Sequence, residues 1–213
     1  MRLTRIATRT GDDGRTGLGD GSRVAKDDAR IEALGEIDAT STAIGAILTH
    51  PLPASLERWL DELATRVQSD LFAIGAELGT PGHRLFDTGQ VARLDTELAR
   101  ANNDLPPLAE FILPRGTAAA MQAHAARTTC RRAERRVISL ARAMNGNALF
   151  AQPAAAAPEM DEGLPPGLAP TAGDSALRPE IGAYLNRLSD LLFVIARRLN
   201  RDAGVADTLW QRD

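Results

Sequence analysis

The chain has 213 residues, of which 44% are hydrophobic and 25% are charged, so it can build a folded core and is not a disordered polymer. Only 4% of the residues are aromatic, and because strands favour aromatic and β-branched side chains, the composition favours helices. The formal net charge of −3 argues against a nucleic-acid-binding protein held by bulk positive charge.

Residues that build disulfides and metal sites are scarce. Cys130 is the single cysteine, which excludes an intramolecular disulfide, and the three histidines show no metal-ligand spacing. We therefore predict no metal site built from protein side chains. No run of about 18 apolar residues predicts a membrane span, and residues 1–14 lack the apolar core of a signal peptide. We expect a cytoplasmic protein without membrane contact.

The N-terminal segment, residues 1–26, is predicted to be a loop. Residues 8–26 contain five glycines and no hydrophobic periodicity. Asp27 or Asp28 can cap the helix that follows, and Pro51 ends it. The apolar face of this helix consists of Ala33, Ile37, Ile44 and Leu48.

Four further helices are predicted from apolar residues that recur every three or four positions: 55–78, 88–101, 118–144 and 180–202. Phe111–Pro114 is predicted to be a short extended segment. Residues 145–179 are predicted to be a flexible insertion, because 151–177 hold five of the twelve prolines and no lysine, arginine or aromatic residue. No strand pattern of useful length appears. The sequence thus predicts a single all-α domain, a five-helix bundle with a four-helix core, in which residues 27–144 provide the first four helices.

The glycine-rich loop has the composition of a polyphosphate-binding segment. Glycines let backbone N–H groups converge on an anion, and threonine hydroxyls add donors. Neither a Walker sequence nor an EF-hand pattern is present, so a disordered terminus is the plain alternative. The candidate ligands of a polyphosphate are Thr8, Arg9, Thr10, Gly11, Thr16, Gly17 and Lys26, the last being the only lysine of the chain.

The predicted helix 118–144 carries a dense run of arginines. At 100° per residue, Arg127, Arg131 and Glu134 share one face with Arg135 on its flank, beside an apolar stripe that includes Cys130. Bidentate guanidinium groups suit phosphate, and a bound polyanion relieves their mutual repulsion. A solvated charged face is the alternative. Nucleic acid is disfavoured by the acidic net charge.

The last predicted helix adds a polar face. Asn186, Asp190, Phe193 and Arg197 line it beside the core stripe. An asparagine can donate and accept hydrogen bonds at once, as recognition of a ribose or base requires, although a packed polar residue would look the same.

Three long strings together resemble the PduO-type ATP:cob(I)alamin adenosyltransferases. They are TRTGDDGRTGLGDGSRVAKDDARIEALGEIDATSTAIG (8–45), FILPRGTAAAMQAHAARTTCRRAERRV (111–137) and YLNRLSDLLFVIAR (184–197). The similarity covers nearly the whole chain in the same order, apart from residues 145–180. The resemblance implies a homotrimer of five-helix bundles that binds ATP at each subunit interface. It implies transfer of the 5′-deoxyadenosyl group of ATP to the cobalt of reduced cobalamin, with release of triphosphate.

The resemblance also implies residue roles. Thr8 to Gly11, Thr16, Gly17 and Lys26 would wrap the polyphosphate together with Mg²⁺. Asp38 would pair with Arg127 across the interface, and Phe111 would lie under the corrin ring. The ATP site would be completed by Arg131, Arg132, Glu134, Arg135 and Asn186, of which Arg131 would act with Asp38 and Arg127 in catalysis.

The chain departs from the family pattern at two places within the strings that carry the resemblance. Arg115 occupies a position where the family usually has a second glycine, and the residues after Asp38 differ from the commoner Glu-Leu-Asn. Partners implied by the resemblance are a flavin-type reductase that supplies electrons and a B12-dependent enzyme that receives the product. The alternatives are a non-catalytic carrier or sensor of nucleotide or cobalamin, and an arginine-rich helical interaction protein without a small ligand.

Overall fold

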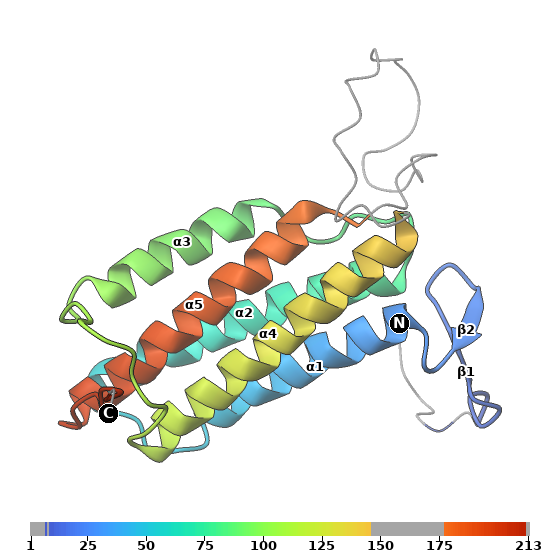
Figure 1. The fold of residues 1–213 in the computed structure, drawn as a ribbon. Helices are drawn as coiled ribbons and strands as arrows, with labels where there is room; N and C mark the ends of the chain where they lie inside the picture. The colour runs from blue at the N-terminus through green and yellow to red at the C-terminus, as the bar shows by residue number, and fades with distance from the viewer. Residues whose placement is uncertain (1–6, 8, 146–176, 212–213) are drawn as a thin grey trace, which may run out of the picture.

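The computed structural model describes residues 7, 9–145 and 177–211, which form five helices and one hairpin (Figure 1). The elements are β1 (Arg15–Gly17), β2 (Arg23–Ala25), α1 (Ala29–Ile47), α2 (Ala54–Gly79), α3 (Gly89–Asn102), α4 (Ala118–Met144) and α5 (Pro179–Asp202). The predicted all-α bundle is confirmed, and α2 to α5 lie within one residue of their predicted bounds. Nearly all of the predicted insertion 145–179 falls on residues 146–176, outside the described residues.

Two helices begin at side-chain caps. The Asp28 carboxylate accepts a hydrogen bond from the backbone N–H of Arg30 at 2.8 Å, and the Thr117 hydroxyl accepts one from the N–H of Ala120 at 3.1 Å. Each cap satisfies an N–H group that has no partner within the helix. The cap at Asp28 fixes the start of α1 at one of the two predicted residues.

The core lies between α4 and its neighbours. α4 packs against α1 and α5, while α2 packs against α1 and α3 against α5; Figure 1 shows these helices running side by side. The predicted apolar stripe on α4 is buried, and its alanines and Cys130 let the neighbouring helices approach closely. The members of this stripe are Ala126, Cys130, Ala133, Val137 and Leu140.

The N-terminal segment differs from the loop predicted for it. β1 and β2 pair antiparallel, with Thr16 opposite Val24. The hairpin docks on the end of α2, where the Gly19 N–H donates to the carbonyl of Gly79 at 2.7 Å. A Cβ at Gly19 would overlap the Thr80 side chain, so a glycine is required at this contact.

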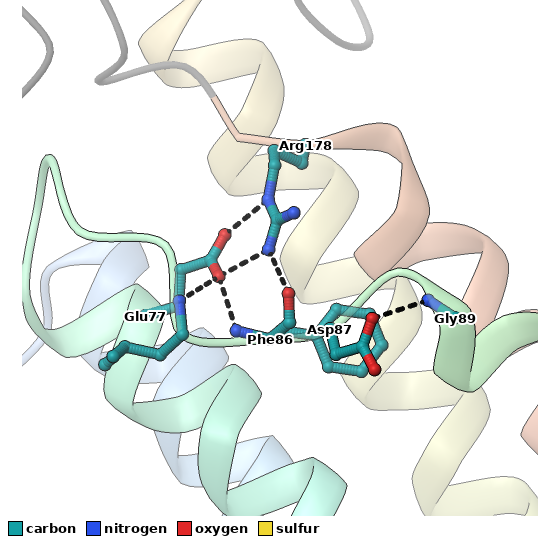
Figure 2. A network of polar contacts seen from close by, with 6 residues as sticks. Glu77, Phe86, Asp87, Gly89 and Arg178 are labelled. Atoms are coloured by element: carbon teal, nitrogen blue, oxygen red, sulfur yellow. Dashed lines mark hydrogen bonds and ion pairs between the residues drawn. The ribbon is translucent and has the colours of Figure 1, made fainter. Parts of the chain in front are cut away.

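A buried ion pair joins the start of α5 to the end of α2 (Figure 2). Arg178 donates from Nε and Nη2 to the two oxygens of Glu77, at 2.8 and 2.6 Å, and from Nη2 to the carbonyl of Phe86 at 2.7 Å. The same carboxylate accepts the backbone N–H groups of Leu85 and Phe86, both at 2.9 Å. Because every oxygen of Glu77 is paired, this network fixes the connection between α2 and α3 against α5.

Among the helices of the described residues, none is both long enough and apolar enough to cross a membrane.

Candidate functional site

Two adjoining cavities mark one face of the bundle. The first, of about 580 Å³, is lined by residues of α3, α4 and α5 that include Arg131, Asp190 and Arg197. The second, of about 620 Å³, is lined by Phe111, His124 and their neighbours. Arg127 and Phe193 line both cavities. We call the two cavities together the α4–α5 groove. Its polar end is the first cavity, where more of the charged side chains lie, and its apolar end is the second, where Phe111, Ile112 and Phe193 lie beside Glu110, His124 and Arg127.

Arg127 stands at the junction of the two cavities. Its Nε is buried and has no hydrogen-bond partner among the described residues. Burial lowers the pKa of its guanidinium group, and the positive charge of Arg131, one helical turn further on, lowers it too. The side chain as a whole is only partly buried, but a buried N–H donor without an acceptor is costly, and a bound anion or carboxylate removes that cost. The groove is therefore suited to a negatively charged ligand.

Glu134 and Asn186 are not among the residues that line the two cavities, but Glu134 lies close enough to Arg131 and Asp190, which line the first, for their charges to act on it. Burial raises the pKa of the Glu134 carboxyl, the charge of Arg131 lowers it, and Asp190 raises it further. Asn186 is exposed on α5, and it is its backbone carbonyl that accepts a hydrogen bond from the Ser189 hydroxyl. Its amide is thus available to a ligand that enters from solvent.

The structure separates the arginines that the sequence groups together. Arg131 lines the groove, and Arg135 donates back to the carbonyl of Arg131 at 3.0 Å on the exposed flank. Arg132 turns toward α1 instead, where its Nε lies 2.6 Å from a carboxylate oxygen of Glu36. One residue is a rotation of 100° on a helix, which carries Arg132 off the groove face.

The predicted polyphosphate loop is only partly described, since Thr8 lies outside the described residues. A Cβ at Gly11 would lie 3.3 Å from Nζ of Lys26, so the loop brings these two predicted ligands together. Arg9 adopts a φ of 59°, a left-handed conformation, beside Thr10. Thr16 and Gly17 lie in β1. Figure 1 shows this hairpin beside the start of α1, at the end of the bundle far from the segment that carries Phe111.

Asp38 lies on a different face from Arg127. It lines a separate cavity of about 450 Å³ between α1 and α2, together with Ser41 and Phe72. Phe72 is 81% exposed there. No ion pair between Asp38 and Arg127 forms within the described part of this chain.

Phe111 is presented at the rim of the groove with 75% of its surface exposed. Its backbone is extended, as predicted, and pairs with the C-terminal tail, where Ile112 forms a bridge with Leu209. The neighbouring Arg115 contributes its carbonyl, which accepts from Nδ2 of Asn200 at 2.8 Å. The strict need for glycine falls on Gly116, which has a φ of 121° and where a Cβ would overlap the Asn200 amide.

Sequence reasoning missed His124 as a candidate for this site. Its ring is 4% exposed, its Nδ1 has no hydrogen-bond partner in the described residues, and its centroid lies 6.1 Å from that of Phe193. The one feature of the sequence that could have indicated it is its position on α4, one helical turn before Arg127. Side chains able to hold a metal do not gather anywhere in residues 7, 9–145 and 177–211.

Comparison with known proteins gives a consistent result. The family model described as cobalamin adenosyltransferase matches residues 6–161. A cobalamin adenosyltransferase of Cupriavidus metallidurans is 46% identical over 213 residues, which is 100% of this chain and 97% of the relative. A corrinoid adenosyltransferase of Mycobacterium bovis is 38% identical over 220 residues, covering 99% of this chain and 95% of the relative.

A solved structure of similar fold carries two ligands. It is a variant PduO-type ATP:corrinoid adenosyltransferase from Lactobacillus reuteri complexed with cobalamin and ATP. Its TM-score is 0.75 at 26% identity, and the match covers 98% of this chain and 100% of that one.

Proposed function

The chain belongs to the cobalamin adenosyltransferase family and is an ATP:corrinoid adenosyltransferase, and we propose that its α4–α5 groove is one half of the active site. The reaction transfers the 5′-deoxyadenosyl group of ATP to the cobalt of cob(I)alamin. Cobalt donates its electron pair to C5′, the C5′–O bond breaks, and that bonding pair leaves with triphosphate. The products are adenosylcobalamin and triphosphate.

We propose that the polar end of the groove holds the triphosphate and nucleoside. Arg127 and Arg131 supply the charge, and Glu134, Arg135 and Asn186 complete the contacts. Preorganised cations stabilise the charge that develops on a leaving triphosphate, and they need no reorganisation during the reaction. Cob(I)alamin is itself a strong nucleophile, so the protein need not supply a general base, and its main task is to align cobalt with C5′.

The N-terminal loop is proposed to reach this site from a second subunit of a homotrimer. Within one chain the β1–β2 hairpin lies at the far end of the bundle from the connection between α3 and α4 (Figure 1), and Asp38 lies on another face from Arg127. A neighbouring copy would bring Thr8 to Gly11 over the phosphates and pair its Asp38 with Arg127. Arg132, engaged with Glu36, would exchange that partner for a phosphate.

Mg²⁺ is proposed to enter with the nucleotide. It prefers phosphate oxygens and water over cages made only of protein ligands, which fits a described chain without a cluster of carboxylates or histidines for it. Its chemistry would be to neutralise phosphate charge beside Arg127 and Arg131.

The apolar end is proposed to take the corrin ring. Phe111 and Phe193 offer apolar surface there, and an aromatic wedge under the ring would exclude water and the lower axial ligand. Loss of that ligand makes Co(II) easier to reduce, because an axial donor raises the orbital that accepts the electron. We further propose that a flavin-type reductase donates the electron and that a B12-dependent enzyme accepts the product. The setting proposed for these steps is the cytoplasm.

The observation that carries this assignment is the buried Nε of Arg127, which has no partner in the described chain and lies where the polar and apolar cavities meet. The test is to supply the protein with ATP, Mg²⁺ and chemically reduced cobalamin and to measure adenosylcobalamin and triphosphate in equal amounts. Turnover that is lost in Arg131→Ala supports the site. Binding of both ligands without either product would make the protein a carrier or sensor instead.

A further inference from the structure

We propose that Asp207 is a positioning residue for the corrin substrate, acting through buried Arg197 to set the place of the segment that carries Phe111. The inference rests on the proposed function, because it takes Phe111 to be a contact of the corrin. It concerns the C-terminal tail, residues 203–211, to which neither the sequence pattern nor the proposed site gives a role.

Arg197 holds both the tail and the connection between α3 and α4, residues 103–117, which carries Phe111 and is here called the Phe111 segment. It lies on α5, is 4% exposed, and donates from Nε to Oδ2 of Asp207 at 2.9 Å. Its Nη2 donates to the carbonyl of Pro106 at 2.8 Å. The carboxylate of Asp207 is itself 19% exposed. A guanidinium group so deeply buried needs its partner, since the fork has fixed geometry and an unpaired charge is costly.

The tail in turn holds the strand on which Phe111 stands. The N–H of Trp210 donates to the carbonyl of Phe111 at 2.7 Å, and the N–H of Leu113 donates to the carbonyl of Thr208 at 2.8 Å. Both bonds lie close to Asp207 along the tail. Within the described residues the backbone of Phe111 to Leu113 pairs with the tail alone, while Asn200 of α5 holds the chain further on, at Arg115 and Thr117. The tail therefore supports the stretch that carries Phe111 ahead of this second attachment.

The tail is attached to the bundle at two places, the end of α5 and Asp207. The N–H of Val205 donates to the carbonyl of Asn200 at 2.8 Å, and Gly204 takes a φ of 74° as the chain turns back. Beyond this turn the ion pair of Asp207 joins the tail to α5 through a side chain. Without it, the stretch that presents Phe111 would lose one of the supports that fix its distance from the groove.

The surface built by this arrangement is apolar and open. Leu108, Phe111, Val205, Leu209 and Trp210 are five large hydrophobic side chains with 37% to 75% of their surface exposed, and all lie on the Phe111 segment or the tail. Leu108, Val205 and Leu209 line one cavity, and Leu108 and Phe111 line the apolar end of the groove. Apolar surface of this kind beside a groove suits a large, partly apolar ring. Arg197 lines the cavity that Leu108, Val205 and Leu209 share, and it also lines the polar end of the groove. It therefore links the position of the apolar surface to that of the polar end.

The test compares Asp207→Asn and Asp207→Glu with the matched control Glu62→Gln. The control breaks the exposed Arg58–Glu62 pair, which has the same N–O distance of 2.9 Å. Each variant is assayed for kcat, for KM of ATP and of reduced cobalamin, and for binding of cob(II)alamin in the presence of ATP. Because a misplacement of about 1 Å can cost about 100-fold, we expect Asp207→Asn to lower kcat/KM for cobalamin about tenfold or more.

The expected pattern separates positioning from loss of structure. ATP affinity stays within about twofold, Glu62→Gln behaves as the wild type, and Asp207→Glu recovers part of the loss. If Asp207→Asn does not fold, Arg197→Met with Asp207→Leu removes both charges and keeps the interior apolar, and the same loss of cobalamin binding is expected. Unchanged cobalamin parameters, or equal loss of ATP and cobalamin binding, would overturn the proposal. An inactive wild type would reject the proposed function instead, while cob(II)alamin binding would still decide the role of Asp207.

Discussion

Arg127 and Asp38 line cavities on two different faces of the same chain, one between α4 and α5 and the other between α1 and α2. The buried Nε of Arg127 has no acceptor in the described residues. A second copy of the chain can satisfy both observations by bringing its Asp38 to Arg127, as a heterologous interface of a ring does. If Asp38 and Arg127 pair between subunits, the effect on ATP binding of changing the charge at one residue depends on the charge at the other.

The test is charge reversal. Asp38→Arg and Arg127→Asp are each expected to weaken ATP binding at least about tenfold, because each leaves like charges opposed at an interface. The double variant restores an opposite pair and is expected to regain part of the affinity. Titration calorimetry with ATP and sedimentation velocity measure the two effects. Since the residues lie on separate faces within one chain, recovery can arise only between chains, and additive losses in the double variant would contradict the pairing.

Phe111→Ala is expected to separate the two substrates. The ring is 75% exposed, so its removal costs little folding free energy, about 0.5 kcal/mol or less. ATP affinity should stay unchanged, while the rate of adenosylcobalamin formation falls because the corrin loses an apolar contact. Leu85→Ala, another exposed apolar side chain away from the groove, is the control. Loss of ATP binding in Phe111→Ala would show that the corrin is placed wrongly.

The helices are predictable because their signals are local. Apolar periodicity and the cap at Asp28 specify bounds that do not depend on the tertiary structure. The proline at 51 specifies the end of α1 less well, because the helix ends at Ile47, four residues before it. The same periodicity places Arg127 and Arg131 on one face, and the groove confirms it. The β1–β2 hairpin is missed because strands of three residues carry too little pattern, and the docking of Gly19 on Gly79 gives no signal in the sequence.

Side-chain partners from distant segments cannot be predicted in the same way. The charged run groups Arg132 with Arg131, but the partner that turns Arg132 toward α1 is Glu36, 96 residues away. Helical spacing puts Arg197 on a ligand-binding face, whereas its ion pair with Asp207 depends on how the tail folds back. Such pairs follow from packing, which propensity and periodicity do not specify.

Arg178→Met is expected to destabilise the bundle strongly. Its guanidinium group is bound to Glu77 in a pair whose side chains are only 14% and 9% exposed (Figure 2). Removing one partner of a buried pair typically costs about 3–5 kcal/mol, so we expect Tm to fall by more than about 6 °C. Glu62→Gln, which breaks an exposed pair, should shift Tm by less than about 2 °C. Equal shifts in the two variants would show that the network of Figure 2 contributes little to stability.

His124 provides the last prediction, which concerns pH. Burial lowers the pKa of its imidazole, and the charge of Arg127 lowers it further, whereas Asp207 opposes the shift. In the unfolded chain this histidine binds a proton below about pH 6.5, while the folded protein keeps it neutral to a lower pH. Unfolding therefore takes up a proton, and the free energy of unfolding falls as the pH drops from about 6.5 through the lowered pKa, by at most about 1.4 kcal/mol per pH unit.

The measurement is urea denaturation of the wild type and of His124→Gln between pH 8 and pH 5. We expect the free energies of unfolding to differ by a constant amount above about pH 7. Below about pH 6.5 the wild type should lose stability faster than the variant. The raised pKa values of Asp70 and Glu134, both caused mainly by burial, act in the opposite direction, but they are present in both proteins and cancel in the difference. Parallel curves over the whole range would mean that His124 is protonated as readily in the folded groove as in the unfolded chain.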